Sequence, residues 1–252
     1  MFYYLSLPSR ISPIIIFGFL EYFIYNFSSI FYILPFILIL IFFSVKNIRV
    51  REDLSIKYYA FLIFPLIFEL SFVTYLMMEM DFLKPHLLIF LNSLILYFYF
   101  RTLRLYFSGI DKGLSLNNIT IFGNFVLVYF MASSVYGLQS FLRVPVWASM
   151  IVFAILLGML VYSVMYINKI DYSVSIFYIM IVCLIMMELA WSIYFLPVSY
   201  KISGLVLAIG YYMIMGLTRH HLMDTLRSRV VKLYFIFGFL SILLILLTSR
   251  WV

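Results

Sequence analysis

The sequence is poor in charge and in cysteine, and each shortage excludes a class of protein. Of 252 residues, 11% are charged and 66% are hydrophobic, whereas an ordinary soluble domain has about 25% charged and about 45–50% apolar residues. One water-soluble globule of this length cannot bury so much apolar surface, which excludes a soluble enzyme and a disordered protein. The single Cys183 lies inside an apolar run, so a disulfide framework and a CxxC metal site are also excluded.

Sequence signatures of catalysis are missing as well. The chain has no GxSxG, no P-loop, no GxGxxG and no DDxxD-type carboxylate run. His220 and His221 are followed by Asp224, but this cluster has no HExxH and no second group of ligands. We therefore expect no catalytic residue, no metal and no cofactor, and the sequence favours a protein that is not an enzyme.

Long apolar runs are what the sequence does have, and they predict nine transmembrane helices, since a spanning helix needs about 20 residues. Only Asn26, Ser28 and Ser29 separate the first two, so a tight hairpin is expected there. The sequence thus predicts an all-α, polytopic transmembrane helix bundle that forms a single membrane domain over residues 1–252. The expected spans are 11–26, 29–45, 58–79, 85–101, 119–138, 146–167, 174–196, 202–218 and 231–249.

The distribution of Lys and Arg predicts the orientation. Cytoplasmic loops of membrane proteins carry an excess of basic residues. With the N-terminus in the cytoplasm, thirteen cations lie inside and four outside. We expect a plasma (inner) membrane protein with its C-terminus outside. The inner cations are Arg10, Lys46, Arg49, Arg51, Lys57, Arg101, Arg104, Lys112, Lys169, Arg219, Arg227, Arg229 and Lys232, and the outer ones are Lys84, Arg143, Lys201 and Arg250.

An internal repeat emerges when the chain is shifted against itself by 119 residues. The segment 69–75 then falls on 188–194, and Phe17-Gly18 falls on Tyr136-Gly137. Chance matches are common among Phe, Ile and Leu, but the chain has only five glutamates and two of them coincide. An even number of helices per half gives both halves the same orientation, so the repeat is expected to be parallel.

The repeat divides the chain into four helices, four helices and one more. Residues 1–118 form the first repeat, 119–230 the second, and 231–252 an additional C-terminal helix. The second repeat holds pairs of small residues four apart, which let helices approach closely. Those pairs are Ser133 with Gly137, Ala154 with Gly158, and Gly204 with Ala208.

Two glutamates lie deep inside predicted spans. Glu69 is the twelfth residue of the third span and Glu188 the fifteenth residue of the seventh. An ionised carboxylate at such depth is costly, so these acids usually face the bundle interior and have a partner. Residues equally far from a hairpin turn share a depth, which makes Asn92 the expected partner of Glu69 and Tyr211 that of Glu188. These four residues form the candidate substrate- or ion-binding site.

Three further features lie near these acids or near the outer ends of helices. Pro65 lies four residues before Glu69, so it should kink that helix and release the carbonyl of Phe61 from its ladder bond. Glu21 lies toward the outer end of the first span and is interpreted as reaching the interface. His86 is interpreted as a solvated interfacial histidine.

Basic residues also gather at the predicted cytoplasmic ends of two spans. Cations at a helix C-terminus are favoured by the helix dipole and by anionic lipid headgroups. We expect this face to contact the headgroups of the bilayer and expect no nucleic-acid partner. The residues of this basic face are Arg101, Arg104, Arg219, His220 and His221.

Short motifs in the C-terminal half resemble an uncharacterised family. The resemblance spans residues 174–235 and is to a domain of unknown function found in small multi-pass proteins from reduced-genome bacteria of the candidate phyla. It implies a polytopic membrane protein and no assigned activity. The motifs are Glu188-Leu-Ala-Trp191, Leu196-Pro197, Tyr211-Tyr212 and Gly216-Leu-Thr-Arg-His-His221.

Two functions remain open. The first is a small secondary carrier or channel-like protein that uses Glu69 and Glu188 at a central polar site. The alternative is a membrane scaffold or assembly subunit in which the acids are structural, acting with a partner membrane protein or as a homo-oligomer. If each acid bonds only within its own hairpin, the acids hold helices together instead of carrying a substrate.

Overall fold

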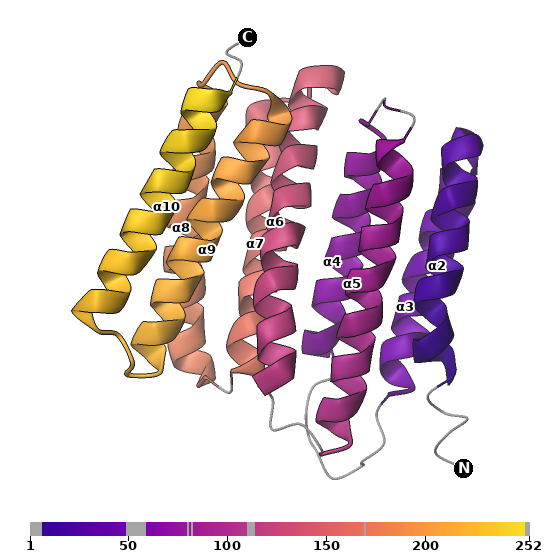
Figure 1. Cartoon of the computed structure of the whole chain (residues 1–252), viewed down its shortest axis with the longest axis horizontal. Helices are drawn as coiled ribbons and strands as arrows, with labels where there is room; N and C mark the ends of the chain where they lie inside the picture. The colour runs from indigo at the N-terminus through magenta and orange to yellow at the C-terminus, as the bar shows by residue number, and fades with distance from the viewer. Residues whose placement is uncertain are drawn as a thin grey trace. The chain divides into compact units, whose positions relative to one another are not determined.

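The helices occupy nearly all of the chain that the structure describes. This computed structural model describes residues 7–48, 59–79, 81, 83–109, 114–168 and 170–249. Of the cations counted above, Arg49, Arg51, Lys57, Lys112, Lys169 and Arg250 lie outside these residues. The elements are α2 (Leu7–Tyr25), the 3-10 turn η1 (Phe27–Ser29), α3 (Ile30–Lys46), α4 (Tyr59–Leu76), α5 (Lys84–Phe107), α6 (Leu114–Leu142), α7 (Val146–Ile167), α8 (Tyr172–Tyr194), α9 (Tyr200–Leu222) and α10 (Ser228–Thr248) (Figure 1).

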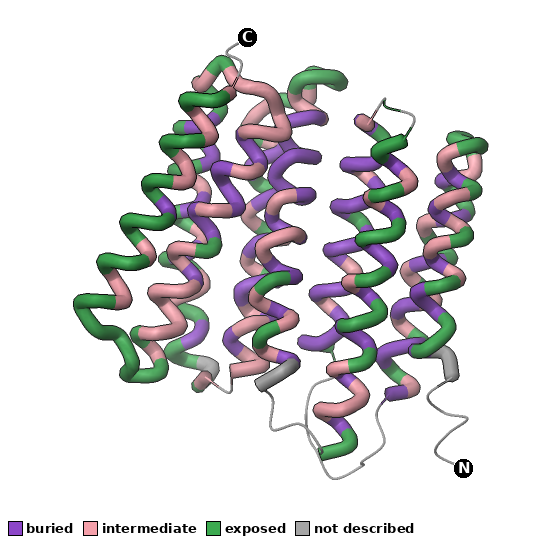
Figure 2. The backbone as a smooth tube through the Cα atoms, in the orientation of Figure 1, coloured by how far each residue is buried: buried purple, intermediate pink, exposed green. Residues whose placement is uncertain are grey.

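These helices confirm the predicted all-α membrane architecture. Within the described ranges, eight segments are long and apolar enough to cross a membrane. Helices α5 and α6 are longer than expected, since α5 continues to Phe107 and α6 begins at Leu114. Many large apolar side chains are exposed, and Gly238 is the only buried residue of α10. In Figure 2, α10 is coloured almost entirely as exposed or intermediate. Such a surface suits lipid, so the chain is a multi-pass membrane protein.

The chain divides into two compact units, Met1–Gly123 and Asn124–Val252, with the division falling inside α6. In the first unit, α2 packs against α3 and α5, and α4 packs against α3 and α5. The four helices therefore form a closed bundle. Helix α4 is the most buried of the candidate spans (Figure 2). Its Phe61, Phe64, Phe68 and Phe72 are all enclosed.

The turn between α2 and α3 confirms the expected hairpin. The backbone N–H of Asn26 donates to the carbonyls of Tyr22 and Phe23 at 3.1 Å each. The hydroxyl of Ser29 donates to the carbonyl of Asn26 at 2.5 Å. These short-range bonds satisfy the backbone groups that the end of α2 and the start of α3 leave open, which allows the chain to reverse over three residues.

In the second unit, α8 packs between α7 and α9, and α10 packs on α9. Helix α6 contacts three of these helices through side chains. Tyr136 donates its hydroxyl to the carbonyl of Ala190 on α8 at 2.8 Å. Gln139 hydrogen-bonds to the hydroxyl of Ser149 on α7. Phe125 lies edge-on to Tyr212 of α9, with 6.3 Å between ring centroids.

Close approach of helix backbones occurs at a glycine that the small-residue pattern identified. A Cβ added to Gly204 of α9 would lie 2.8 Å from the backbone nitrogen and 3.0 Å from the Cα of Ser133 in α6. Atoms of a backbone cannot rotate away as a side chain does. A residue larger than glycine at position 204 therefore forces α6 and α9 apart.

The Gly204→Ala substitution should lower the free energy of unfolding by about 1–3 kcal/mol, the usual cost of adding a methyl group to a filled interface. The matched control is Gly158→Ala, because a Cβ there meets only side-chain atoms at 3.6 Å and beyond. Denaturation of the purified protein in a detergent titration measures both. Equal stability of the two variants would contradict the close approach of α6 and α9.

Candidate functional site

A buried carboxyl–amide pair links α4 to α5. Asn92 donates from Nδ2 to Oε1 of Glu69 at 2.7 Å. The exposed fractions of the two side chains are 1% and 0%. The two residues are 23 apart in sequence and lie at equal distances from the turn between the helices. The predicted contact between Glu69 and Asn92 is confirmed.

A second polar contact in the same hairpin involves the proline kink. Pro65 lies inside α4 and has no N–H to donate to the carbonyl of Phe61 one turn earlier. The hydroxyl of Tyr99 on α5 donates to that carbonyl at 2.6 Å. The carbonyl released by Pro65 is thus satisfied by the neighbouring helix. Asn92 and Tyr99 lie two turns apart on α5 and hold α4 at two depths.

Two oxygen atoms of the carboxyl–amide pair have no hydrogen-bond donor in the described part of the chain. Oε2 of Glu69 and Oδ1 of Asn92 are both buried and have no hydrogen-bond partner among the described residues. A buried acceptor without a donor costs about 1–3 kcal/mol. The hydroxyls of Ser12 and Ser93, in the described part of the first unit, are also buried without a partner, but only Glu69 and Asn92 combine such an oxygen with a hydrogen bond to each other.

The second acid is placed differently from the prediction. Glu188 is exposed on α8, and Tyr211 of α9 is buried with no partner for its hydroxyl among the described residues. The expected pair of Glu188 with Tyr211 is therefore wrong. Successive residues of a helix are about 100° apart, and Met186 and Ala190 point into the second unit. Glu188, two residues from each, is rotated onto the opposite side.

The exposed side of α8 forms a continuous stripe around Glu188. Its other members are apolar or aromatic and recur every three or four residues, which is the spacing of one helix face. The hydroxyl of Ser192, one turn beyond Glu188, is exposed too and donates to the Glu188 carbonyl at 2.8 Å. We call this surface the α8 stripe, and its apolar members are Phe177, Ile181, Leu184, Trp191 and Phe195.

Helices α2 and α5 are joined near both ends by polar contacts that sequence reasoning missed. Nδ1 of His86 lies 2.6 Å from Oε2 of Glu21, and both side chains are partly buried. At the other end, Arg104 donates from Nη1 to the carbonyl and to the hydroxyl of Ser9, at 2.9 Å each. His86 is thus paired instead of simply solvated. Only the packing of α2 against α5 reveals these pairs, because their members are 65 and 95 residues apart.

The predicted basic face includes residues with several different neighbours. Arg101 is exposed, whereas Arg104 binds Ser9. Nδ1 of His220 lies 2.9 Å from the hydroxyl of Thr225. The ring of His221 contacts Tyr178 at 6.0 Å between centroids. Within the described ranges, no group of three or more His, Cys, Asp or Glu residues is arranged to hold a metal ion.

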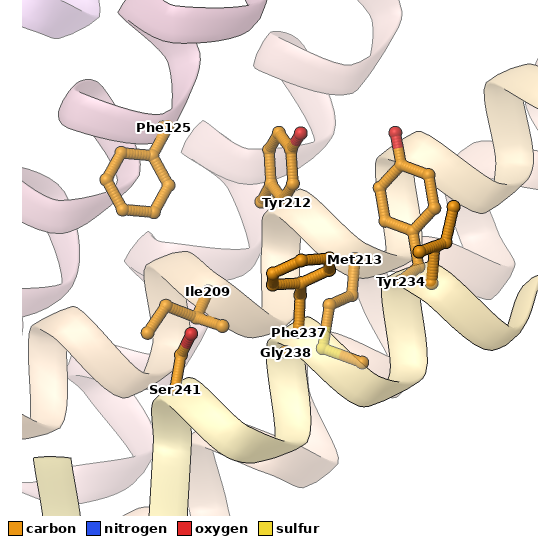
Figure 3. Close-up of a pocket in the computed structure, with 9 residues that line it drawn as sticks. Phe125, Ile209, Tyr212, Met213, Tyr234, Phe237, Gly238 and Ser241 are labelled. Carbon is orange, nitrogen blue, oxygen red and sulfur yellow. The ribbon is translucent and has the colours of Figure 1, made fainter. Parts of the chain in front are cut away.

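A groove of about 510 Å³ opens between α6, α9 and α10. Figure 3 shows its aromatic and aliphatic walls, with the hydroxyl of Ser241 at one end and the ring of Tyr234 at the other. Neither Glu69 nor Glu188 lines it. Its lining residues are Phe125, Ile209, Tyr212, Met213, Leu233, Tyr234, Phe237, Gly238 and Ser241.

Comparison with known proteins identifies the family of the chain. A family model described as "Protein of unknown function (DUF5656)" matches residues 41–248, most of the chain and far more than the 174–235 over which the motifs resemble such a family. No curated protein and no solved structure matches the chain. The expected membership in a family of unknown function is confirmed.

The Asn92→Leu substitution should destabilise the protein by about 1–3 kcal/mol, because it removes the donor from a buried carboxyl group. The double variant Glu69→Leu/Asn92→Leu should recover most of this loss, since neither polar group then remains. Unfolding by a detergent titration measures both variants. Glu188→Leu is the control and should not lower stability, because Glu188 is exposed and its carboxyl group has no partner to lose among the described residues of its own hairpin. A stability loss in the double variant equal to the sum of the losses in the two single variants would contradict a direct Glu69–Asn92 interaction.

Proposed function

The chain belongs to the DUF5656 family of proteins of unknown function, and we propose that this protein is a non-catalytic membrane assembly subunit. Its α8 stripe binds a transmembrane helix of a second polypeptide. The partner helix presents a basic or hydrogen-bond-donating side chain at the depth of Glu188. One observation carries the proposal: a carboxyl group is exposed in the middle of an otherwise apolar helix face.

Glu188 lies deep enough along α8 for its carboxyl group to be costly against lipid. It lies six residues before the end of α8, which corresponds to about 9 Å at 1.5 Å per residue. That position is inside a hydrocarbon core about 30 Å thick when the helix crosses it. An ionisable group at such depth is costly against lipid and is usually paired. A donor on a second helix removes this cost and makes the association specific.

The other acid supports the same assignment. Glu69 bonds to Asn92 inside one helical hairpin, which suits a residue that holds two helices together. Neither acid lines the groove between α6, α9 and α10 or the shallower groove between α2 and α5 at Pro13 and Tyr97.

The internal repeat and the orientation belong to this proposal as well. Shifted by 119 residues, α2 to α5 overlap α6 to α9 in the same order. Two of the helix contacts also correspond, because α3 packs on α4 as α7 packs on α8, and α4 on α5 as α8 on α9. These correspondences support a parallel repeat with α10 added. The charge count supports a plasma (inner) membrane location with a cytoplasmic N-terminus.

Photo-crosslinking in native membranes tests the assembly role. The photoreactive residue p-benzoylphenylalanine replaces Leu184, one turn from Glu188 in the α8 stripe. In the control variant, the same photoreactive residue replaces Ile155 of α7, whose exposed fraction is similar to that of Leu184. We expect one product of defined mass from position 184 only. Glu188→Ala should reduce its yield by roughly fivefold, as expected for the loss of one hydrogen bond between membrane helices, whereas Glu188→Asp should retain it.

Three outcomes would contradict this assignment. The first is the absence of a product from position 184. The second is an equal yield of crosslinked product from the protein with Glu188 and from the Glu188→Ala variant, which would mean that the carboxyl group contributes nothing to binding. The third is a product of twice the mass of the chain, which would show that a second copy occupies the stripe.

A secondary carrier is the second candidate, and the unpaired oxygens of Glu69 and Asn92 favour it. Protein in liposomes that contain a pH-sensitive dye should then conduct protons under an imposed potential. Glu69→Gln should abolish this flux without loss of stability, because the glutamine carbonyl still accepts from Asn92. Glu188→Gln, on the exposed side of α8, is the control and should conduct normally. Absence of flux in the unmodified protein would contradict the carrier.

A further inference from the structure

We infer that the groove between α6, α9 and α10 is a binding site for one anionic phospholipid. The groove holds an acyl chain, and the basic residues at the α9–α10 turn hold the head group. This site is separate from the α8 stripe and does not depend on the assembly role.

The walls of the groove suit an acyl chain. Every lining residue is apolar or aromatic except Ser241 and the hydroxyls of Tyr212 and Tyr234. The volume of about 510 Å³ falls within the roughly 300–1,000 Å³ of typical small-ligand sites. In Figure 3 the rings of Phe125, Tyr212 and Phe237 surround the space, and Met213 forms part of its wall. No acidic side chain lines it.

Helices α9 and α10 pack closely against each other and form the base of the groove. A Cβ added to Gly238 would collide with the side chain of Met213, and one added to Gly216 would collide with the ring of Tyr234. The two helices touch at these glycines. The larger side chains Phe237 and Tyr212, both exposed, stand beside the contact and form the sides of the groove.

The end of the groove at Tyr234 lies next to the cations. The ring of Tyr234 contacts that of His220, with 5.9 Å between centroids. Arg219 lies in the last turn of α9, adjacent to His220. Arg229 and Lys232 lie in the first turns of α10 and are exposed. Asp224, also exposed, is the acid in the connecting turn.

Depth along α9 matches the dimensions of one lipid leaflet. Ile209, at the inner end of the groove, lies thirteen residues before the end of α9 at Leu222. At 1.5 Å per residue this is about 20 Å, close to the half-thickness of a bilayer that is about 40–45 Å thick with its headgroups. A lipid whose phosphate lies among Arg219, Arg229 and Lys232 therefore places its chain along the groove.

Charge decides which lipid is favoured. A zwitterionic head group gains little from a cluster of cations, whereas each Lys or Arg near an anionic head group contributes appreciably to binding. Phosphatidylglycerol is the probe because it has one net negative charge and two ordinary acyl chains. Phosphatidylcholine with the same chains is the matched neutral lipid.

Quenching of tryptophan fluorescence by lipids with brominated acyl chains tests the site. The full chain first receives Trp147→Phe, Trp191→Phe and Trp251→Phe, and then Phe237→Trp in the groove. The control has Phe239→Trp instead, because Phe239 is on the same helix and is equally exposed, at 66% against 65%, but does not line the groove.

In mixed bilayers, the reporter at position 237 should prefer brominated phosphatidylglycerol over brominated phosphatidylcholine by about fivefold or more, as expected for one or more cation contacts. The reporter at position 239 should show no preference. Arg219→Gln/Arg229→Gln/Lys232→Gln should abolish the preference at position 237 while quenching itself remains, which shows that the protein is still folded and in the bilayer.

Either of two results would overturn the site. Equal quenching by the two lipids at position 237 would mean that the groove takes ordinary bilayer lipid. A preference that persists in the triple variant would mean that these cations do not hold the head group. Crosslinking at position 184 is independent of both, so failure of the lipid site and failure of the assembly role are distinguishable.

Discussion

Polar groups inside a bilayer have no water to bind, and this constraint accounts for most of the specific contacts in the protein. Each helix satisfies most of its own backbone internally, so only a few side chains and the carbonyls released by Pro13, Pro35 and Pro65 inside helices need partners from elsewhere. In the α4–α5 hairpin, Asn92 binds Glu69 and Tyr99 binds the carbonyl that Pro65 releases. These bonds fix the depth and rotation of α4 against α5, which apolar packing alone specifies poorly.

The two units meet this constraint in different ways. The first relies on large aromatic side chains and on polar bonds within and between its helices, including the contacts of His86 with Glu21 and of Arg104 with Ser9. The second relies on small residues that let backbones touch, as at Gly204 and Ser133. Apolar contact between helices gains little over contact with lipid, so close backbone approach supplies the packing energy there.

The matched acids have different surroundings because their helices are rotated differently. Glu69 and Glu188 coincide in the sequence shift and lie seven and six residues before the ends of their helices, yet one is enclosed and the other is exposed. An exposed carboxyl in a membrane helix is costly on its own and is well explained by a binding partner. In the assembly proposal, the buried acid holds α4 to α5 through Asn92, and the exposed acid binds the partner helix.

The sequence by itself determined the membrane class, the succession of helices and the depth of each polar residue. Apolar runs and turn residues set these features directly, which is why Asn92 was predicted to meet Glu69. Only the tertiary structure decided which way each helix is rotated. A helix that is apolar on all sides has no polar stripe to mark its outer face, and lipid-facing residues are the same types as protein-facing ones. The exposure of Glu188, the pairing of Glu21 with His86 and the groove beside Tyr234 therefore followed from packing, which the sequence pattern does not encode.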